Sequence, residues 1–549
     1  METLTAQPRE QSRPGVATAG PRARLRVALL AHEPLQPRWA VDAFARIEAL
    51  EFAELVAVVL LHGTARNVPL LWQAYRRLDE WAFGLKLDRL QLLELNSQFP
   101  GSMHIACDVR DPQWRARLHA LAVDVLFALD DVDDQSLQGV ARYGVWRFCL
   151  GESGEHDSLA GIRELAGGSA VMASGVKATL RPDEPGRMLY QSWSRIFPYS
   201  LARTRDNLLP RATHFVERTL RMLHEGGESW MQNCAPVQSE PATVRRLDSE
   251  DLVTLASVLG FRLARAVQQR AYVQQWFLAY RFGGGLGGDR NWQGDFRNFT
   301  WMLPPKDRFW ADPFPLEREG RHWIFFEELL FARGRAHISV VEVSPNGLQG
   351  APVKVLERAY HLSYPFLVEH EGELFMIPET GENHSIEIYR CKRFPDEWTL
   401  EAELLRGSFF TDATVHRAGG RWWLFTNVSA AGTQGSDELN IYHAETLFGP
   451  WRPHRLNPVK CDVRGARPAG RLYEVDGRLY RPGQIGAPIY GAGVAINEVL
   501  TLTPQEYREI EVQRVVPSHP KEILGIHTLN RSGTLTVVDG FTRRPRIWS

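Results

Sequence analysis

Five segments in the C-terminal half share one pattern, in which a polar or charged residue opens an apolar strand and a glycine turn follows. The opening residues lie 52, 48, 55 and 60 residues apart, and they are Asp312, Tyr364, Asp412, Arg467 and His527. Three returning strands repeat a second polar position 15 residues later, at Glu327, Glu379 and Asn427. Two carboxyl groups that lie close together cannot both ionise freely, so one can stay protonated as an acid while another acts as a base. The pattern therefore indicates general acid–base chemistry, provided that the fold brings these positions together.

The elements that must position these residues are the blades of a propeller. A period near 50 residues, with two strong hairpin strands and two weaker ones in each unit, is typical of a propeller blade. We therefore predict a five-bladed β-propeller over residues 285–549, with the opening residues at one mouth of its central channel. The aromatic segment 275–282 reads as a strand that supplies the missing edge of the ring.

We assign roles to eleven residues of this propeller. Asp312, Glu379 and Asp412 are the candidate catalytic residues. The candidate substrate-binding residues are Trp310, Glu327, Glu328, Tyr364, Asn427, Arg467, Gln484 and His527. A competing interpretation is that Asp and Asn open strands simply because they cap turns. We expect no bound metal and no cofactor.

Several short motifs carry a resemblance to a known family. WADPF (310–314), IPET (377–380), TDATV (411–415) and ARPAG (466–470) resemble the domain that lies N-terminal to the transferase domain in plant glucosamine inositolphosphorylceramide transferase. The resemblance covers nearly all of 290–549. That domain is similar to five-bladed hydrolases of the arabinanase, xylosidase and invertase kind. The similarity implies a base or nucleophile at Asp312, a general acid at Glu379 and a residue that tunes its pKa at Asp412.

One motif of the propeller departs from the family pattern. The usual RPAQD motif is RPGQI here, so Gln484 is kept but an acidic residue becomes Ile485. The interpretation of the propeller as a binding module that only docks a glycan therefore stays open beside the catalytic one.

The N-terminal half alternates apolar strands (26–31, 54–61, 123–129) with helical stretches, which is typical of a Rossmann-like α/β domain. The turn after the first strand, HEPLQP, has no glycine, so a dinucleotide fingerprint is absent. We divide the chain into a disordered tail (1–24), the α/β domain (25–228), a helical linker with the closing strand (229–284) and the propeller (285–549).

Two runs of the α/β domain, ARYGVWRFCLGE (141–152) and RPDEPGRML (181–189), resemble the active-site loops of the formyltransferase fold. In that alignment Arg147, Cys149 and Glu184 stand where active members have Asn, His and Asp. Arginine cannot accept a proton near neutrality and cysteine cannot replace a neutral imidazole donor, so we predict an inactive formyltransferase-like domain.

Composition narrows the range of partners. Lys and Arg total 64 against 65 Asp and Glu, a formal charge of −1, which disfavours nucleic acid. The five cysteines form no CxxC pair and no segment is apolar enough to span a membrane, so we expect a cytoplasmic protein without an integral membrane segment.

We expect a carbohydrate-active protein, namely a glycoside hydrolase or transglycosidase that acts on a cell-envelope or lipid-linked glycan. We also expect it to work with a partner glycosyltransferase. The alternatives are a non-catalytic glycan-binding module and a nucleotide-sugar N-formyltransferase.

Overall fold

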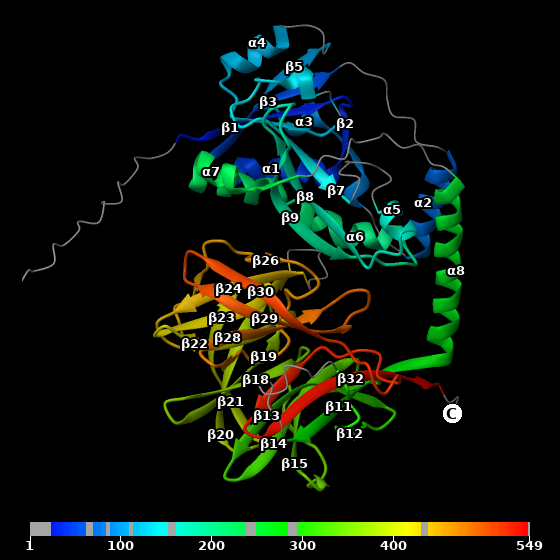
Figure 1. The fold of residues 1–549 in the computed structure, drawn as a ribbon, viewed down its shortest axis with the longest axis vertical. Coiled ribbons are helices and arrows are strands. Elements are labelled where there is room, and N and C mark those ends of the chain that lie inside the picture. Colours follow the sequence, from blue (N-terminus) through cyan, green and yellow to red (C-terminus); the bar gives the residue numbers. More distant parts are fainter. Residues whose placement is uncertain are drawn as a thin grey trace, which may run out of the picture.

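The computed structural model describes residues 23–61, 70–83, 88–108, 113–130, 132, 134–151, 161–237, 249–283, 294–429 and 437–546. Figure 1 shows an α/β part stacked on a β part, with the long helix α8 (Ser249–Ala271) running along one side between them. Residues 1–22 of the predicted tail and residues 284–288 of the glycine-rich segment lie outside the described residues.

The α/β part is built on one mixed sheet of eight strands. Its spatial order is β10-β9-β8-β7-β6-β1-β3-β5, with β5, β3, β1, β6 and β7 parallel and the β8–β9–β10 side antiparallel. The strands are β1 (Leu25–Ala31), β3 (Ala53–Leu61), β5 (Met103–Cys107), β6 (Val125–Ala128), β7 (Val145–Leu150), β8 (Val171–Thr179), β9 (Arg187–Arg195) and β10 (Ala235–Pro236). Because β1, β6 and β7 are buried almost throughout, they are apolar runs without alternation, as parallel strands covered on both faces require. The α/β class is thus present, while its formyltransferase-like identity stays a prediction.

The helices of this part cover the sheet and reach the propeller. They are α1 (Arg38–Ala45), α2 (Leu70–Ala82), α3 (Leu95–Gln98), α4 (Gln113–Ala120), α5 (Ile162–Ala166), α6 (Leu201–Ala212) and α7 (Phe215–Asn233). A small antiparallel two-stranded sheet of β2 (Leu35–Pro37) and β4 (Leu92–Glu94) lies beside α1. Trp39, Phe44, Phe127 and Phe148 form the aromatic centre of the core, with edge-to-face and tilted contacts.

The β part is a five-bladed propeller, as the sequence period predicts. Blade 1 has β13 (Arg308–Arg318), β14 (Arg321–Leu330), β15 (Arg335–Ser344), β16 (Gly347–Leu348) and β17 (Val353–Leu356). Blade 2 has β18 (Ser363–His370), β19 (Glu373–Thr380), β20 (Ser385–Arg393) and β21 (Glu397–Arg406). Blade 3 has β22 (Phe409–Ala418), β23 (Arg421–Ser429), β24 (Glu438–Ala444), β25 (Arg452–Pro453) and β26 (Lys460–Cys461). Blade 4 has β27 (Tyr473–Val475), β28 (Arg478–Ile485), β29 (Gly493–Leu502) and β30 (Tyr507–Val515).

The hairpin turns explain why the first two strands of these blades are so regular. In blades 1 to 4 a two-residue turn joins them, at 319–320, 371–372, 419–420 and 476–477, and both turn residues have positive φ. Such type I′ turns match the twist of antiparallel strands, and their second position is glycine in every one of the four.

Blade 5 joins two distant parts of the chain. It consists of β31 (Leu529–Ser532), β32 (Leu535–Pro545), β11 (Tyr272–Phe282) and β12 (Thr300–Met302). β11 includes the aromatic segment 275–282 and pairs with β32 from Tyr272↔Pro545 to Phe282↔Leu535 without a break in register. The strand before blade 1 thus closes the ring, while the predicted boundaries at 228/229 and 284/285 remain predictions.

We expect Leu278→Ala to destabilise the propeller by about 2–4 kcal/mol, since truncating a buried leucine removes its packing and leaves a cavity. Leu278 lies in β11, is 1% exposed and packs in the cluster of Met302 and Val537. Denaturant unfolding of the whole chain measures the loss, with Leu348→Ala at a 43% exposed position as the matched control. Equal stability of the two variants would mean that β11 does not hold the ring closed.

Buried ion pairs join the two parts of the molecule. Arg218 of α7 binds Glu438 of β24 through two hydrogen bonds of 2.6 and 3.0 Å, and Arg211 of α6 pairs with Asp437. Arg211 and Asp437 are both 2% exposed. Because a charge pair buried this deeply needs both partners in place, the α/β part is fixed on the propeller rather than loosely tethered.

Among the helices that the structure describes, none has both the length and the hydropathy that a membrane crossing requires.

Candidate functional site

Three innermost strands carry the same backbone distortion at the positions that the repeat singles out. Asp312, Tyr364 and Asp412 have φ values of 50°, 46° and 53°, and the strand pairing shifts register at each of them. A non-glycine residue in this left-handed region is strained, and an extra residue at such a bulge re-aims its side chain. The recurrence of the bulge in three blades shows that the equivalent positions are built alike, and it turns all three side chains into the buried axis.

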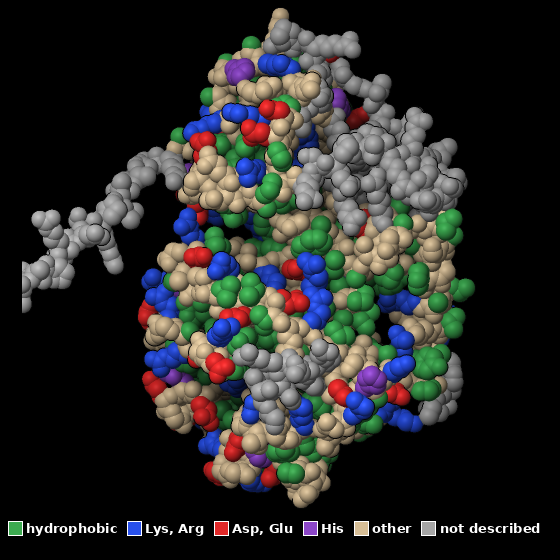
Figure 2. Space-filling view, in the orientation of Figure 1, with side chains coloured by type: hydrophobic (Ala, Val, Ile, Leu, Met, Phe, Trp, Pro, Cys, Tyr) green, Lys and Arg blue, Asp and Glu red, His purple; other side chains and the backbone are tan. Residues whose placement is uncertain are grey.

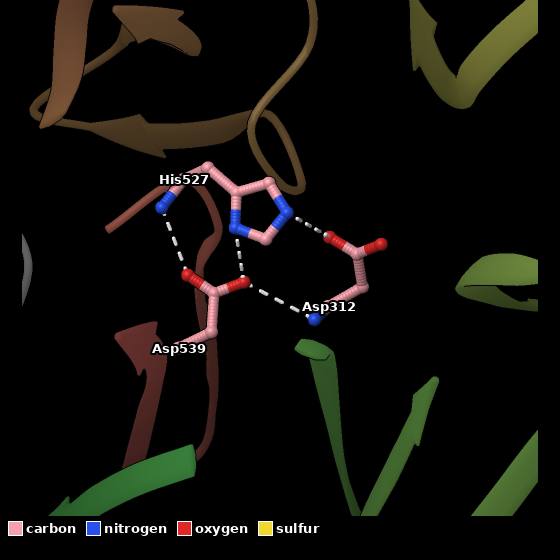
Figure 3. Close-up of side chains that lie close together, drawn as sticks. All are labelled: Asp312, His527 and Asp539. Carbon is pink, nitrogen blue, oxygen red and sulfur yellow. Dashed lines mark hydrogen bonds and ion pairs between the residues drawn. The ribbon is translucent and has the colours of Figure 1, made fainter. Parts of the chain in front are cut away.

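The first polar cluster at the axis consists of Asp312, His527 and Asp539 (Figure 3). His527 Nε2 lies 3.4 Å from Asp312 Oδ1, and its Nδ1 lies 2.6 Å from Asp539 Oδ2. The Asp312 backbone N–H donates to Asp539 at 3.1 Å, and the Thr528 hydroxyl donates to Asp312 at 2.6 Å. All of these side chains are buried, so the cluster is a closed network of charges and hydrogen bonds.

The second cluster consists of Arg467, Asp412 and Glu379. Arg467 Nη2 lies 3.2 Å from Asp412 Oδ1 and 3.5 Å from Glu379 Oε2. One guanidinium thus faces two carboxyl groups from neighbouring blades, and Glu379 lies close enough to Asp412 to hydrogen-bond with it. Arg467 balances one negative charge, so this cluster is most stable when Glu379 and Asp412 hold one proton between them.

The surroundings of these groups shift their pKa values, and each shift has its own physical cause. Burial, and then Asp412, raise the pKa of Glu379 well above its usual value. Burial is the main cause that raises the pKa of Asp312 to about 7, although His527 opposes the shift. Burial opposes the charged form of His527, but Asp539 and Asp312 outweigh it and raise the pKa of the imidazole to about 9. The surroundings therefore favour the protonated form of Glu379 and the cationic form of His527.

Asp312, His527 and Asp539 also have the donor types of a metal site, because their ligand atoms lie within 4.8 Å of one another. A cationic imidazole already balances the two carboxylates, however, and its Nδ1 faces Asp539. A metal ion would have to displace the proton of this imidazole and its contact with Asp539, so the arrangement in the structure is that of an ion-pair network.

Hydrogen bonds at the axis also tie one blade to the next. The Tyr364 backbone N–H of blade 2 donates to Asp312 of blade 1 at 3.3 Å. The Tyr364 hydroxyl lies 2.9 Å from Thr414 of blade 3 and accepts from the Gly470 N–H of blade 4 at 2.8 Å. Part of this polar set is therefore structural, because it holds the inner strands around the channel.

Aromatic rings form one wall of the cluster. Trp276 of β11 lies with its ring centre 4.2 Å from that of His527, and Tyr490 lies 5.4 Å from His527. The Arg467 guanidinium lies over the Tyr490 ring at 5.6 Å. Glu327 pairs with His361, with 3.1 Å between Oε1 and Nε2. Burial disfavours a charged His361, but its hydrogen bond with Glu327 raises the imidazole pKa to about 9.

Besides Tyr364 and Glu327, the structure places four predicted site residues outside these two clusters. Trp310 donates to Glu328 at 3.1 Å, and Glu328 also binds Arg308 and His337 in a network within blade 1. Alternate residues of a strand face opposite sides, so Glu328 points away from the side that Glu327 occupies. Asn427 donates to the Glu438 carbonyl at 2.7 Å, and the buried Gln484 binds the Arg467 carbonyl through its backbone N–H at 2.7 Å.

Sequence reasoning missed three members of the site. Asp539 has a signal: it lies in the returning strand of blade 5, the counterpart of the strands that carry Glu327 and Glu379. Tyr490 comes from the connection between β28 and β29, and Trp276 from a strand that precedes the repeats. The repeat therefore offers no signal for the last two.

In the α/β part, the predicted formyltransferase-like positions do not come together. Cys149 pairs with Gly175 at one end of β7, whereas Glu184 lies in the turn after β8, which pairs with the opposite end of β7 at Val145. Glu184 is exposed and paired with Arg181, and the Arg147 guanidinium donates to the Val132 carbonyl at 2.9 Å. Burial is the main cause that raises the pKa of the Cys149 thiol.

The α/β part contacts the end of the propeller that carries the site. The Val463 N–H donates to the Trp193 carbonyl of β9 at 3.0 Å, and Arg464 stacks on the Trp193 ring at 4.3 Å. Arg467 follows three residues after Arg464. The candidate site therefore lies near the junction of the two parts.

Fold and site together define a five-bladed propeller with a strained, buried ring of carboxyl groups balanced by one arginine and one histidine. Residues 303–533 match the family described as "Glucosamine inositolphosphorylceramide transferase 1, N-terminal". This confirms the resemblance that the sequence motifs carry.

Named relatives match the same part of the chain. Glucosamine inositolphosphorylceramide transferase 1 of Oryza sativa subsp. japonica is 35% identical over 208 residues, which are 37% of this chain and 28% of that protein. The protein of the same name from Arabidopsis thaliana is 32% identical over 207 residues, which are 37% of this chain and 27% of that protein. The chain therefore matches less than a third of the length of these relatives.

Two solved structures are similar in arrangement. Zg3597, a family 117 glycoside hydrolase from the marine bacterium Zobellia galactanivorans, is 11% identical with a TM-score of 0.32, and the match covers 49% of this chain and 90% of that one. An exo-1,5-α-L-arabinanase from a bovine ruminal metagenomic library is 13% identical with a TM-score of 0.31, and the match covers 43% and 93%.

Proposed function

We propose that the propeller is a carbohydrate-active domain, a glycoside hydrolase or transglycosidase for a cell-envelope or lipid-linked glycan. The observation that carries the proposal is the Glu379–Asp412–Arg467 cluster. Burial and the second carboxyl group favour the protonated form of Glu379, which is the form that a general acid needs. The match of 303–533 to a family named for glycan transfer to a lipid supports the substrate class.

The chemistry divides between the two clusters. Glu379 donates its proton to the leaving oxygen while the bond between that oxygen and the anomeric carbon breaks. In hydrolysis, ionised Asp312 takes a proton from the attacking water; in transfer, it takes one from a sugar hydroxyl. Asp412 keeps the pKa of Glu379 high, and Arg467 balances the charge that remains after the proton has left.

A second candidate, a glycan-binding module without turnover, also has a specific observation in its favour. Asp312 and Asp412 are only 4% and 2% exposed, and Asp312 accepts hydrogen bonds from Thr528 and from the Tyr364 backbone. A base that is buried and hydrogen-bonded in this way has no free access to water unless the mouth opens.

The test is a glycan-array screen with the whole chain, followed by product analysis of the glycans that bind. If the site is catalytic, we expect Asp312→Asn to abolish turnover and to leave binding largely intact, because the amide keeps its shape but cannot act as a base. If the site only binds, the same change weakens affinity by about 1–3 kcal/mol and there is no turnover to lose.

The matched control is Asp396→Asn, which changes an exposed aspartate of blade 2 that pairs with Arg393. The control should keep both binding and turnover. Binding without any cleavage or transfer by the wild-type protein would reject the enzyme and leave the module. A chain that binds no glycan would contradict both candidates.

Three further expectations belong to the proposal. A partner glycosyltransferase is proposed because the relatives extend far beyond the matched region. A cytoplasmic location remains a prediction from the cysteine pattern.

We also expect no formyl transfer to an amino sugar, since Cys149 and Glu184 lie near opposite ends of β7. Turnover that Cys149→Ala abolishes would contradict this.

A further inference from the structure

The helix α8 exposes an apolar face to solvent along most of its length. Its exposed large side chains, with their exposed fractions, are Val253 (68%), Leu259 (43%), Phe261 (58%), Leu263 (69%) and Val267 (60%). Figure 2 shows hydrophobic side chains along the edge of the molecule where Figure 1 places α8. A helix of a soluble protein normally turns its apolar stripe toward the core, whereas the stripe of α8 faces solvent in the single molecule.

The charged side chains of this stretch turn inward instead. Between Val253 and Val267 the only charged residues are Arg262 and Arg265. Arg262 pairs with Asp79 and donates to the Tyr199 carbonyl at 3.2 Å, and the Arg265 guanidinium lies over the Tyr199 ring at 3.8 Å. Four turns of the helix therefore present no charge to solvent.

Small residues form a ridge along the middle of the exposed face. Ala256, Gly260 and Ala264 are spaced four residues apart and are all exposed. Apart from its chain neighbours and the backbone of α8 itself, no atom of the described residues lies within 4 Å of the position that a Cβ at Gly260 would take. A ridge with this spacing lets a second helix approach closely, with larger side chains packing on both sides of the contact.

The area of this face suits association of two copies. The exposed parts of its five large side chains amount to on the order of 500 Å² per molecule, and the exposed small residues bring the face toward the roughly 800 Å² that one partner buries in an interface of standard size. The face is also self-complementary, since it combines a small ridge with flanking aliphatic side chains and carries no charge that a twin copy would repel.

We propose that a second copy of this chain packs on the exposed face of α8, with the ridge around Gly260 at the helix crossing. A two-fold axis near Gly260 makes the same patch serve both partners. A membrane surface is the other occupant that an apolar helix suggests. Helices that bind anionic bilayers carry several free Lys and Arg beside their apolar face, whereas Arg262 and Arg265 are engaged within the chain and Arg270, in the last turn of α8, is a single exposed cation.

The test is sedimentation velocity of the whole chain over micromolar concentrations. We expect a dimer for the wild type. Leu263→Glu should raise the dimer dissociation constant by about 30-fold or more, because it places a charge in the centre of the interface. Leu400→Glu is the matched control, since Leu400 is 54% exposed on the outer strand of blade 2 and should leave the dimer unchanged.

A second variant separates close packing from general stickiness. Gly260→Leu improves helix propensity and has open space around it, so the monomer should fold normally, as circular dichroism and thermal unfolding would show. It fills the crossing point, and we expect it to weaken the dimer as strongly as Leu263→Glu does.

A third experiment tests membrane binding, by co-sedimentation with phosphatidylcholine vesicles that contain about 30% phosphatidylserine. If α8 docks on lipid instead, the wild type co-sediments with vesicles and Gly260→Leu binds them more tightly, because it adds apolar surface. That result would overturn the proposal. A wild-type chain that stays monomeric throughout, or a dimer that neither variant weakens, would overturn it as well.

Discussion

Replacing Arg467 by methionine is expected to lower the free energy of unfolding by about 3–5 kcal/mol, since it leaves buried carboxyl groups without their counter-charge. Arg467 and Asp412 expose only 13% and 3% of their side chains, and Glu379 exposes 11%. The stem of methionine fills much of the same space, so the loss reports the missing charge rather than a cavity. Urea unfolding at neutral pH measures the change.

Two further proteins sharpen this prediction. Arg478→Met removes a 62% exposed guanidinium that pairs with Glu498, and it should cost less than about 1 kcal/mol. Adding Asp412→Asn to Arg467→Met should restore part of the lost stability, because one of the two uncompensated carboxyl groups is then neutral. If the double variant were less stable than Arg467→Met alone, charge balance would not be the role of Arg467.

Stability is expected to fall as the pH rises from about 4 to about 9 because of the axial groups. The pKa of Asp312 is about 7 in the folded state, whereas the unfolded chain releases this proton near the usual aspartate pKa of 3.8. The folded state therefore binds more protons in this window, and its stability drops by up to about 4 kcal/mol as Asp312 is forced to ionise. Glu379 acts in the same direction.

His527 extends the fall to higher pH. Its pKa is about 9 in the folded state against 6.5 for a free imidazole, so its stabilising contribution is complete below pH 6.5 and is lost as the pH passes 9. Asp312→Asn should make the decline between pH 4 and 7 shallower and leave the part due to Glu379. Urea unfolding at a series of pH values tests this; an unchanged slope in the variant would show that Asp312 is ionised throughout.

The fold of the C-terminal half could be predicted because its signals repeat. Each of the first four blades carries a two-residue turn that ends in glycine, and each strand alternates between an inner and an outer face. A strand that is hard to assign in one blade can therefore be assigned by comparison with the equivalent strand of another. The α/β part offers one copy of each element. Its strands were found from apolar runs such as 26–31 and 54–61, but the antiparallel side of the sheet had no distinct signal.

The candidate site was predictable where it follows the repeat. Asp312, Tyr364 and Asp412 were selected by position, and the structure gives all three the same left-handed bulge. Trp310 and Glu328 were also predicted as site residues, but Glu328 adjoins Glu327 in one strand and neighbours along a strand face opposite sides. Tyr490 and Trp276 reach His527 from a connection and from a strand outside the repeats, and only tertiary structure brings them there.

The pairing of β11 with β32 has a consequence for biosynthesis. A ribosome releases Tyr272–Phe282 long before Leu535–Pro545, and four blades emerge between the two partners. Until the later strand appears, β11 keeps one edge of unpaired N–H and C=O groups, which is the feature of nascent chains that invites misassembly. Ring closure is then a late, long-range event with a high contact order, which makes it slow relative to hairpin formation. The cell must therefore shield an unfinished propeller for most of the time that it takes to make one.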